Sequence, residues 1–237
     1  MATQTSTMTV TAPKTLSVGM KDGQDPTSAI PRQQSDRVGQ YRGYDNVHWY
    51  VGNAKQAATF YTTRMGFKRI AYRGLETGSR AIASHVVRNG GVTFVFTSPL
   101  YAPKDNVSDM CSEDKELLEE IHEHLKQHGD AVRDVAFQVD DVDAVYQAAI
   151  KNGAHSVYAP KELSDDFGTA KYARIRTYGD TTHTLIERGN YAGSFLPGFR
   201  AVDEEEKVNK YLPEVRLNHI DHCVGNQNWD EMEAVCD

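Results

Sequence analysis

Three short stretches of the chain share one pattern of hydrophobic and polar positions. Val47, Trp49 and Val51 stand at alternate positions, which is the two-residue period of a half-buried β-strand. The alternation returns at residues 135–139 and begins a third time at residues 220–224. The three stretches follow one another at nearly equal intervals, which predicts a recurring supersecondary unit rather than a short solenoid repeat.

A helix is predicted after each of the first two strands. Asn53 is a favourable N-cap residue, and the apolar residues that follow it recur at helical spacing as far as Gly66. Asp140 or Asp141 can cap the second helix in the same way, and Gly153 ends it. Each strand is therefore expected to lead directly into a helix that packs through one apolar face.

Three β-like runs, separated by glycine-containing or polar turns, follow each helix. They cover residues 68–73, 81–88 and 92–97 in the first unit, and residues 156–159, 171–178 and 182–187 in the second. Residues 112–128 carry leucine and isoleucine at helical spacing and predict an amphipathic helix between the units. The predicted fold class is α+β, with tandem β-α-β-β-β units.

The same pattern divides the chain into four parts. Residues 1–40 are rich in small and polar side chains and predict a disordered leader, and residues 41–190 hold the two units as one domain. Residues 191–216 contain prolines and an acidic run and are interpreted as a linker. Residues 217–237 begin a third unit. A strand and part of a helix do not make a core. We therefore expect that this segment either starts a truncated domain or docks on the first domain.

Composition narrows the classes of partner. The 237 residues are 39% hydrophobic and 25% charged, as in a soluble globular protein. There are 26 Lys+Arg against 33 Asp+Glu and no basic stripe, so we expect no nucleic acid partner. No apolar run approaches the roughly 18 residues of a membrane-spanning helix, so no membrane association is expected.

Cysteine usage and the N-terminus indicate the compartment. Cys111, Cys223 and Cys236 form no CxxC pair, which argues against a disulfide scaffold and a structural zinc site. The chain begins without a charged start followed by an apolar segment, so no secretory signal is expected. We therefore expect a cytoplasmic protein.

Paired β-α-β-β-β units commonly enclose a cavity in which metal ligands come from the first and last strands of a unit. At the first-strand position the three units offer Trp49, Phe137 and His222, of which only the histidine can bind a metal. Glu187, at the end of the second unit's last strand, is a plausible carboxylate ligand by position. Because it would coordinate alone, the first two units are expected to give structural support.

Other histidines are weaker candidates. His124 and His128 are four residues apart on the predicted connecting helix and could bind a metal at its surface, although a solvated face is the preferred interpretation. His48 and His183 alternate with apolar neighbours in strands, which favours structural roles.

Two stretches carry a specific resemblance. Residues 178–187 (YGDTTHTLIE), followed by residues 194–199 (SFLPGF), and residues 219–227 (HIDHCVGNQ) resemble the 4-hydroxyphenylpyruvate dioxygenase family. The resemblance covers about residues 41–237 and corresponds to the family's N-terminal half and the start of its catalytic half. It implies the vicinal oxygen chelate (glyoxalase-like) fold, in agreement with the tandem units.

The resemblance implies an Fe(II)-dependent oxidoreductase of tyrosine and phenylalanine catabolism. In that family, two histidines and one glutamate hold the iron, and the 2-keto acid group of 4-hydroxyphenylpyruvate chelates it. The products formed with O2 are homogentisate and CO2. The full-length parent is expected to be a homodimer or homotetramer whose partners are the small-molecule 2-keto acid and O2.

His222 matches the family's first iron ligand. His219 is a rival, but its distance from the Val224-Gly225-Asn226 motif differs from the family pattern. Asp221 alternates to the opposite face of the predicted strand and is not expected to bind the metal. The second histidine and the glutamate correspond to positions beyond residue 237. We therefore expect no catalytic residue within this fragment, an incomplete iron site and no activity alone.

Two alternatives stay open. A relative of the family, 4-hydroxymandelate synthase, uses the same substrate and iron ligands and differs in pocket residues that this sequence does not contain. The other alternative is a non-catalytic assembly domain from a truncated product.

Overall fold

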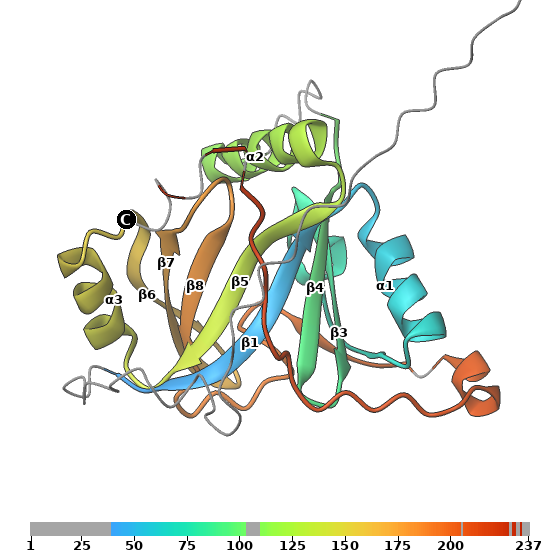
Figure 1. The fold of residues 1–237 in the computed structure, drawn as a ribbon. Helices are drawn as coiled ribbons and strands as arrows, with labels where there is room; N and C mark the ends of the chain where they lie inside the picture. Colours follow the sequence, from blue (N-terminus) through green and yellow to red (C-terminus); the bar gives the residue numbers. More distant parts are fainter. Residues whose placement is uncertain (1–38, 103–109, 205, 228, 231–232, 234–237) are drawn as a thin grey trace, which may run out of the picture. The chain divides into compact units, whose positions relative to one another are not determined.

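The computed structural model describes residues 39–102, 110–204, 206–227, 229, 230 and 233. Its elements follow the predicted order of two β-α-β-β-β units (Figure 1). The first unit contains β1 (Tyr41–Tyr50), α1 (Ala54–Arg64), β2 (Lys68–Arg73), β3 (Ile82–Asn89) and β4 (Val92–Pro99), with a short 3-10 helix, η2 (Leu75–Thr77). The second contains β5 (Ala131–Val139), α3 (Val142–Lys151), β6 (Ser156–Asp165), β7 (Gly168–Arg176) and β8 (Thr182–Glu187), and α2 (Ser112–His128) connects the units. The predicted α+β fold class is confirmed.

Side-chain caps start both of the helices that follow a first strand. The Asn53 side chain accepts a hydrogen bond from the backbone N–H of Gln56 at 2.9 Å. The Asp141 side chain accepts one from the backbone N–H of Ala144, also at 2.9 Å. These bonds satisfy amide groups that a helix leaves unpaired in its first turn. Asp141, rather than Asp140, is therefore the cap of α3.

One nine-stranded sheet runs through both units in the order β6-β7-β8-β5-β1-β4-β3-β2-β9. Within each unit the first strand is parallel to the last, because β1 pairs with β4 and β5 pairs with β8. The antiparallel pair β1–β5 joins the two units at the centre of the sheet. Figure 1 shows the sheet curling beneath α2, with α1 and α3 at its flanks.

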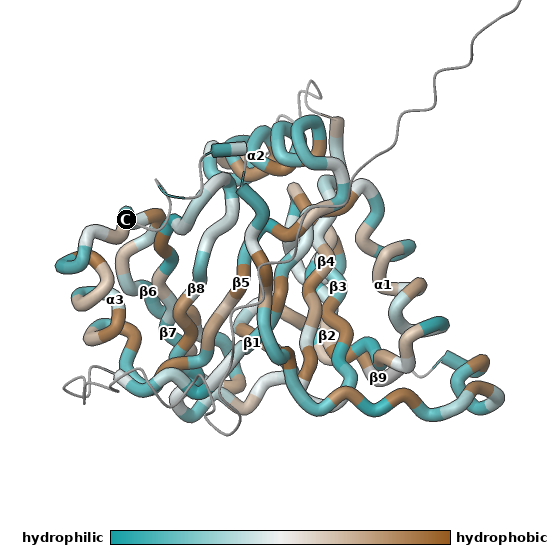
Figure 2. Tube along the Cα trace, viewed as in Figure 1, coloured by the Kyte–Doolittle hydropathy of each residue, from teal (hydrophilic) through white to brown (hydrophobic). Residues whose placement is uncertain are grey.

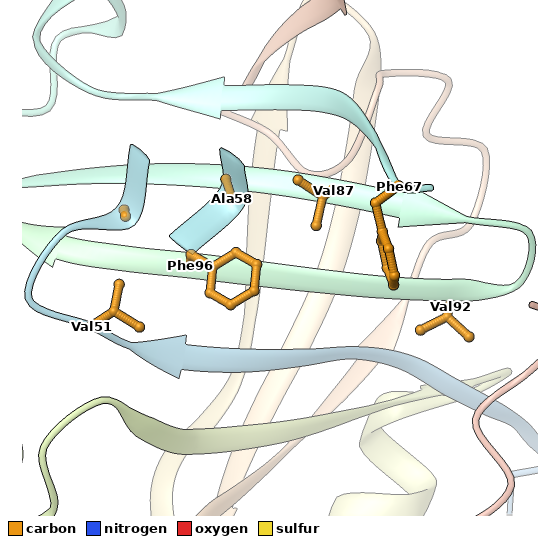
Figure 3. Close-up of a cluster of buried hydrophobic side chains, with 7 residues drawn as sticks. Val51, Ala58, Phe67, Val87, Val92 and Phe96 are labelled. Carbon is orange, nitrogen blue, oxygen red and sulfur yellow. The ribbon is translucent and has the colours of Figure 1, made fainter. Parts of the chain in front are cut away.

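Hydrophobic clusters hold the helices to the sheet. The α1 cluster consists of Val51, Ala54, Ala58, Phe67, Val87, Val92 and Phe96, and Figure 3 shows these side chains beside the strands of the first unit. A second cluster packs α3 against β5, β7 and β8, and a third packs α2 against β1 and β3. Figure 2 shows α2 with a hydrophilic outer side and hydrophobic residues toward the sheet, as its amphipathic pattern predicts.

Part of the predicted linker at residues 191–216 is regular structure that adds to the sheet. Strand β9 (Arg200–Glu204) pairs antiparallel with β2, and a short 3-10 helix, η3 (Lys207–Tyr211), follows it. Just before β9, Phe195 is only 3% exposed and packs against strands β2, β3 and β4. This stretch therefore covers the edge and one face of the sheet instead of only connecting two domains.

The third predicted strand does not form. Residues 212–227 have no regular secondary structure. Leu217 and Ile220 are partly buried against the α1 cluster, so the start of this segment packs on the first unit. Within the described residues, no helix combines the length and the apolar character that a membrane span requires.

Candidate functional site

The inner face of the curled sheet lines a cavity of about 610 Å³. Strands from both units contribute to it, and residues of α2 and of the 195–199 segment lie along its rim. Because β1 and β5 pair at its centre, the two units supply opposite walls. A ligand in this cavity would therefore contact both halves of the domain.

The strand alternation places histidine and tyrosine, rather than tryptophan, in the cavity. Asn46, His48 and Tyr50 of β1 line it. Trp49 lies on the other face, against the α1 cluster. Phe137 of β5 also lies outside the cavity lining, and its ring contacts that of His183 at 5.1 Å. Trp49 and Phe137, which the sequence pattern placed at the positions of metal ligands, thus do not line the cavity.

His48 is part of a buried hydrogen-bonded chain. Its Nε2 lies 2.7 Å from the Thr97 hydroxyl, which lies 2.7 Å from the Ser84 hydroxyl. Burial, together with the nearby Arg174 and Arg133 charges, lowers the pKa of His48 to about 3. The imidazole is therefore neutral at physiological pH. One of its nitrogens is already engaged by Thr97.

Two carboxylates in the cavity are also paired. Asp134, whose side chain is 3% exposed, accepts a 2.5 Å hydrogen bond from Thr182, and Arg174 Nε lies 3.6 Å from the same Asp134 oxygen. Glu120 accepts hydrogen bonds from Arg133 at 2.8 Å and from Tyr50 at 3.1 Å. These contacts offset the cost of removing the carboxylates from water.

The cavity therefore differs from a metal centre. His48, Asp134 and Glu120 line it, and each of these three side chains has a protein partner. Over the described part of the chain, no three His, Cys, Asp or Glu side chains cluster closely enough to hold a metal ion.

Glu187 has a structural contact outside the cavity lining. Its Oε2 accepts a hydrogen bond from the backbone N–H of Val142 at 3.0 Å. Val142 is the first residue of α3, where a carboxylate is favoured by the unpaired amides and the helix dipole. The carboxylate that the sequence analysis considered as a ligand thus connects the end of β8 to the start of α3.

His222 lies in the irregular segment and is exposed. Its Nδ1 is 2.6 Å from Asp221 Oδ2, with side-chain exposures of 71% and 82%. The hydrogen bond from His222 lowers the pKa of Asp221. The expectation that Asp221 points away from His222 is wrong here, because residues 220–224 form no strand and strand alternation does not apply. His219 is also exposed.

Three other histidines that the sequence singled out, His124, His128 and His183, contact protein atoms. His124 is 7% exposed and its Nε2 lies 3.3 Å from the Ala131 carbonyl, so it is more buried than the expected solvated face. His128 Nε2 lies 2.9 Å from Asp180, and His183 Nδ1 lies 3.2 Å from the Val135 carbonyl oxygen.

Of the cysteines, Cys111 and Cys223 are exposed free thiols. Cys236 lies outside the described residues.

Asp134 and Arg174 are cavity residues that the sequence pattern did not reveal. Both were visible as charged residues beside apolar positions in predicted strands, where they are rarely buried unless paired. Only the register of β5, β8 and β7 shows that they face each other.

The paired units, their helices and the enclosed cavity define a class of protein. The chain belongs to the Glyoxalase/Bleomycin resistance protein/Dioxygenase superfamily, whose family model matches residues 43–187.

The curated relatives of this chain narrow the family within that superfamily. The chain is 58% identical over 218 residues to 4-hydroxyphenylpyruvate dioxygenase from Coccidioides posadasii, covering 92% of this chain and 54% of the relative. It is 60% identical over 213 residues to the Aspergillus fumigatus protein of the same name, covering 89% and 53%. The chain thus spans about half the length of the curated relatives it matches.

Among solved structures, a mutant of 4-hydroxymandelate synthase from Streptomyces coelicolor is similar. It matches with a TM-score of 0.54 at 26% identity, over 68% of this chain and 41% of that chain. The two proteins therefore share this fold over the matched part of their chains.

Proposed function

We propose that this chain forms the N-terminal domain and the start of the catalytic domain of a 4-hydroxyphenylpyruvate dioxygenase. The observation that carries the proposal is the 58–60% identity to proteins of that name over about nine-tenths of the chain. The whole protein would convert 4-hydroxyphenylpyruvate and O2 to homogentisate and CO2. Cytoplasmic location and a homodimeric or homotetrameric assembly belong to the same proposal.

In this proposal His222 is one of the Fe(II) ligands. It is exposed, and its imidazole contacts the Asp221 carboxylate. A facial triad requires two histidines and one carboxylate around the ion. The described residues thus do not fit a complete iron site, and we derive no reaction step from them. The same reasoning predicts that these 237 residues bind Fe(II) weakly and are inactive alone.

The N-terminal cavity has a supporting role in the proposal. Its histidine is hydrogen-bonded to Thr97, and both the buried Asp134 carboxylate and the 35% exposed Glu120 carboxylate are paired with arginines. Converting these side chains to iron ligands would break contacts that compensate their burial. We therefore assign iron to the His222 region and not to this cavity.

The test has a genetic and a biochemical part. The coding sequence downstream of Asp237 is expected to encode a second histidine and a glutamate at the corresponding positions of a fourth unit. The product of the uninterrupted gene should bind one Fe(II) under anaerobic conditions and release homogentisate, and His222→Ala should abolish both. His222 is exposed in the 237-residue chain, so the variant of this chain is expected to fold normally, and circular dichroism checks the folding of the longer variant. A tight stoichiometric Fe(II) site in the 237-residue chain, or full activity of His222→Ala, would contradict the proposal.

A second candidate is 4-hydroxymandelate synthase, favoured by the structural similarity at 26% identity. The curated relatives are roughly twice as similar in sequence, which favours the dioxygenase. Product analysis separates the two, since one activity releases homogentisate and the other releases 4-hydroxymandelate. A stop codon after Asp237, with no longer product in the source, would instead favour a non-catalytic assembly domain.

A further inference from the structure

The turn between β3 and β4 holds a distant part of the chain. Asn89, Gly90 and Gly91 form this turn, which we name the socket. Residues 215–220, the docked segment, pass beside it, more than 120 positions later in the sequence. Figure 1 shows the chain after η3 reaching the lower end of the β3–β4 hairpin and then running over the sheet face between α1 and α3.

The Asn89 side chain binds the docked segment with both of its polar atoms. Its amide nitrogen donates to the Val215 carbonyl at 2.9 Å, and its amide oxygen accepts from the Leu217 backbone N–H at 3.2 Å. The same nitrogen also donates to the carbonyls of Met65 and Gly66, each at 3.2 Å. Asn89 is 7% exposed, so these bonds are largely shielded from water. One buried amide thus joins the end of α1 to the docked segment.

The two glycines of the socket leave room for the backbone of the docked segment. A Cβ atom at position 90 would lie 1.8 Å from the Leu217 carbonyl oxygen, and one at position 91 would lie 2.1 Å from the Asn218 carbonyl oxygen. Gly91 N–H also donates to the Leu217 carbonyl at 3.3 Å. Gly90 has φ of +55°, which by itself favours glycine, whereas Gly91 is not among the residues with positive φ. At Gly91, close approach of the docked segment is therefore the physical reason for glycine.

Apolar contacts complete the docking. Leu217 and Ile220 pack on the α1 cluster. His222 follows two residues after Ile220 and remains exposed. The chain also contacts the domain after the histidine, because Cys223 is hydrogen-bonded to Tyr44 and Gly225 lies against the Tyr178 side chain. The His222 ring is therefore accessible within a segment that touches the domain on both sides of it.

We propose that the socket is a positioning site that fixes the path of the chain leading to His222 along the N-terminal domain. Asn89 and Gly91 act through the docked segment and touch no substrate or metal. The role in metal binding rests on the proposed function of His222, whereas the docking itself does not. Anchoring a ligand-bearing strand at its start reduces the conformational freedom that must be lost when the metal binds.

The decisive variant is Gly91→Ala, because it conflicts with the docked segment and not with the backbone of the turn. Gly52→Ala is the matched control: Gly52 also lacks positive φ, and a Cβ there would meet Asp130 at an ordinary 3.7 Å. Both variants are made in the 237-residue chain, so metal and substrate are not involved. Circular dichroism, and hydrogen exchange of the β1–β5 amides, verify that each variant is folded.

Three measurements report on the docked segment. In the wild-type chain and in Gly52→Ala, the Leu217 amide should exchange slowly, and trypsin should cleave slowly after Arg216. In Gly91→Ala we expect both rates to rise by about tenfold or more, as for loss of a locally closed state held by several hydrogen bonds. The NMR signals of the His222 ring should move toward those of a free peptide of the same sequence.

Leu217→Ala provides a second variant in case Gly91→Ala fails to fold. It removes an apolar contact from the segment side and should change the three measurements in the same direction. Equal exchange and cleavage rates in all variants, or wild-type rates as fast as those of the free peptide, would overturn the positioning role. If docking is found but His222→Ala in the longer protein keeps its Fe(II), the proposed function fails while the docking stands.

Discussion

The buried ion pair between Arg188 and Asp45 provides the sharpest test of what holds this domain together. Arg188 Nε and Nη2 contact the two Asp45 oxygens at 2.7 and 2.8 Å. The Asp45 side chain is only 3% exposed and that of Arg188 is 23% exposed. Arg188 also donates to the Phe195 carbonyl and lies over its ring, with 5.5 Å to the centroid. The pair thus joins β1, the end of β8 and the segment that covers the sheet.

We predict that Arg188→Met lowers the free energy of unfolding by about 3 kcal/mol. Removing one partner of a buried pair typically costs about 3–5 kcal/mol, because the remaining charge is left without compensation. We expect the lower end of this energy range, because two groups still stabilise the Asp45 carboxylate after the substitution. Asn46 donates a hydrogen bond to it at 2.8 Å, and the positive charge of Arg88 interacts with it. This loss is large compared with the total free energy of unfolding of a typical domain, about 5–15 kcal/mol.

Urea unfolding followed by circular dichroism measures the effect, and the midpoint should fall by about 1–2 M. Adding Asp45→Asn to Arg188→Met should recover part of the loss, because the second change removes the uncompensated charge. Arg42→Met is the matched control: Arg42 contacts Asp140 at the same 2.7 Å, but the side chains are 55% and 41% exposed, so little change is expected. A loss for Arg188→Met as small as that of the control would refute the reasoning from burial.

Three further predictions follow from the contacts of single side chains. Because the folded pKa of His48, about 3, lies below the usual value near 6.5, its contribution to stability is complete above pH 6.5 and is lost as pH falls toward 3. Uptake of one proton by His48 on unfolding contributes about 1.4 kcal/mol per pH unit to the pH dependence of the free energy of unfolding. This dependence should be weaker in His48→Gln, and an unchanged dependence would refute the lowered pKa of His48. Asn53→Ala should cost about 1 kcal/mol in urea unfolding through loss of the α1 cap, and no cost would show that the cap is dispensable. Glu187→Gln should destabilise less than Glu187→Ala, because an amide oxygen still accepts from Val142; equal effects would argue against the hydrogen bond.

Elements whose signal is local were predicted with their observed bounds. The strand at residues 68–73, the connecting helix at residues 112–128 and the strand at residues 182–187 begin and end where the periodicity predicts. By contrast, β6 was expected at residues 156–159 and extends to Asp165, because β7 pairs with it over that length. β9 was missed for the same reason: its strand character comes from pairing with β2.

The candidate site shows the same division. A nine-residue resemblance singled out His222 as the candidate ligand. In the first strand, the sequence pattern led us to expect Trp49, rather than His48, at the position of a metal ligand. Alternation separates the two faces of β1, but it does not show that the Trp49 face packs against α1 while the His48 face lines the cavity. The Asp134–Arg174 contact likewise depends on how three strands align.

The sequence by itself determined the order of elements, the two repeated units and the family, because periodicity, capping residues and short motifs are properties of neighbouring positions. The tertiary structure alone decided which face of β1 lines the cavity. It also decided that Glu187 accepts a hydrogen bond from the first residue of α3 and that Asn89 is hydrogen-bonded to residues 215 and 217. The two hydrogen-bonded contacts join groups 45 or more positions apart in the sequence, and the face of β1 depends on how α1 packs against the sheet. Such contacts are fixed by strand register and helix packing, which local sequence patterns do not encode.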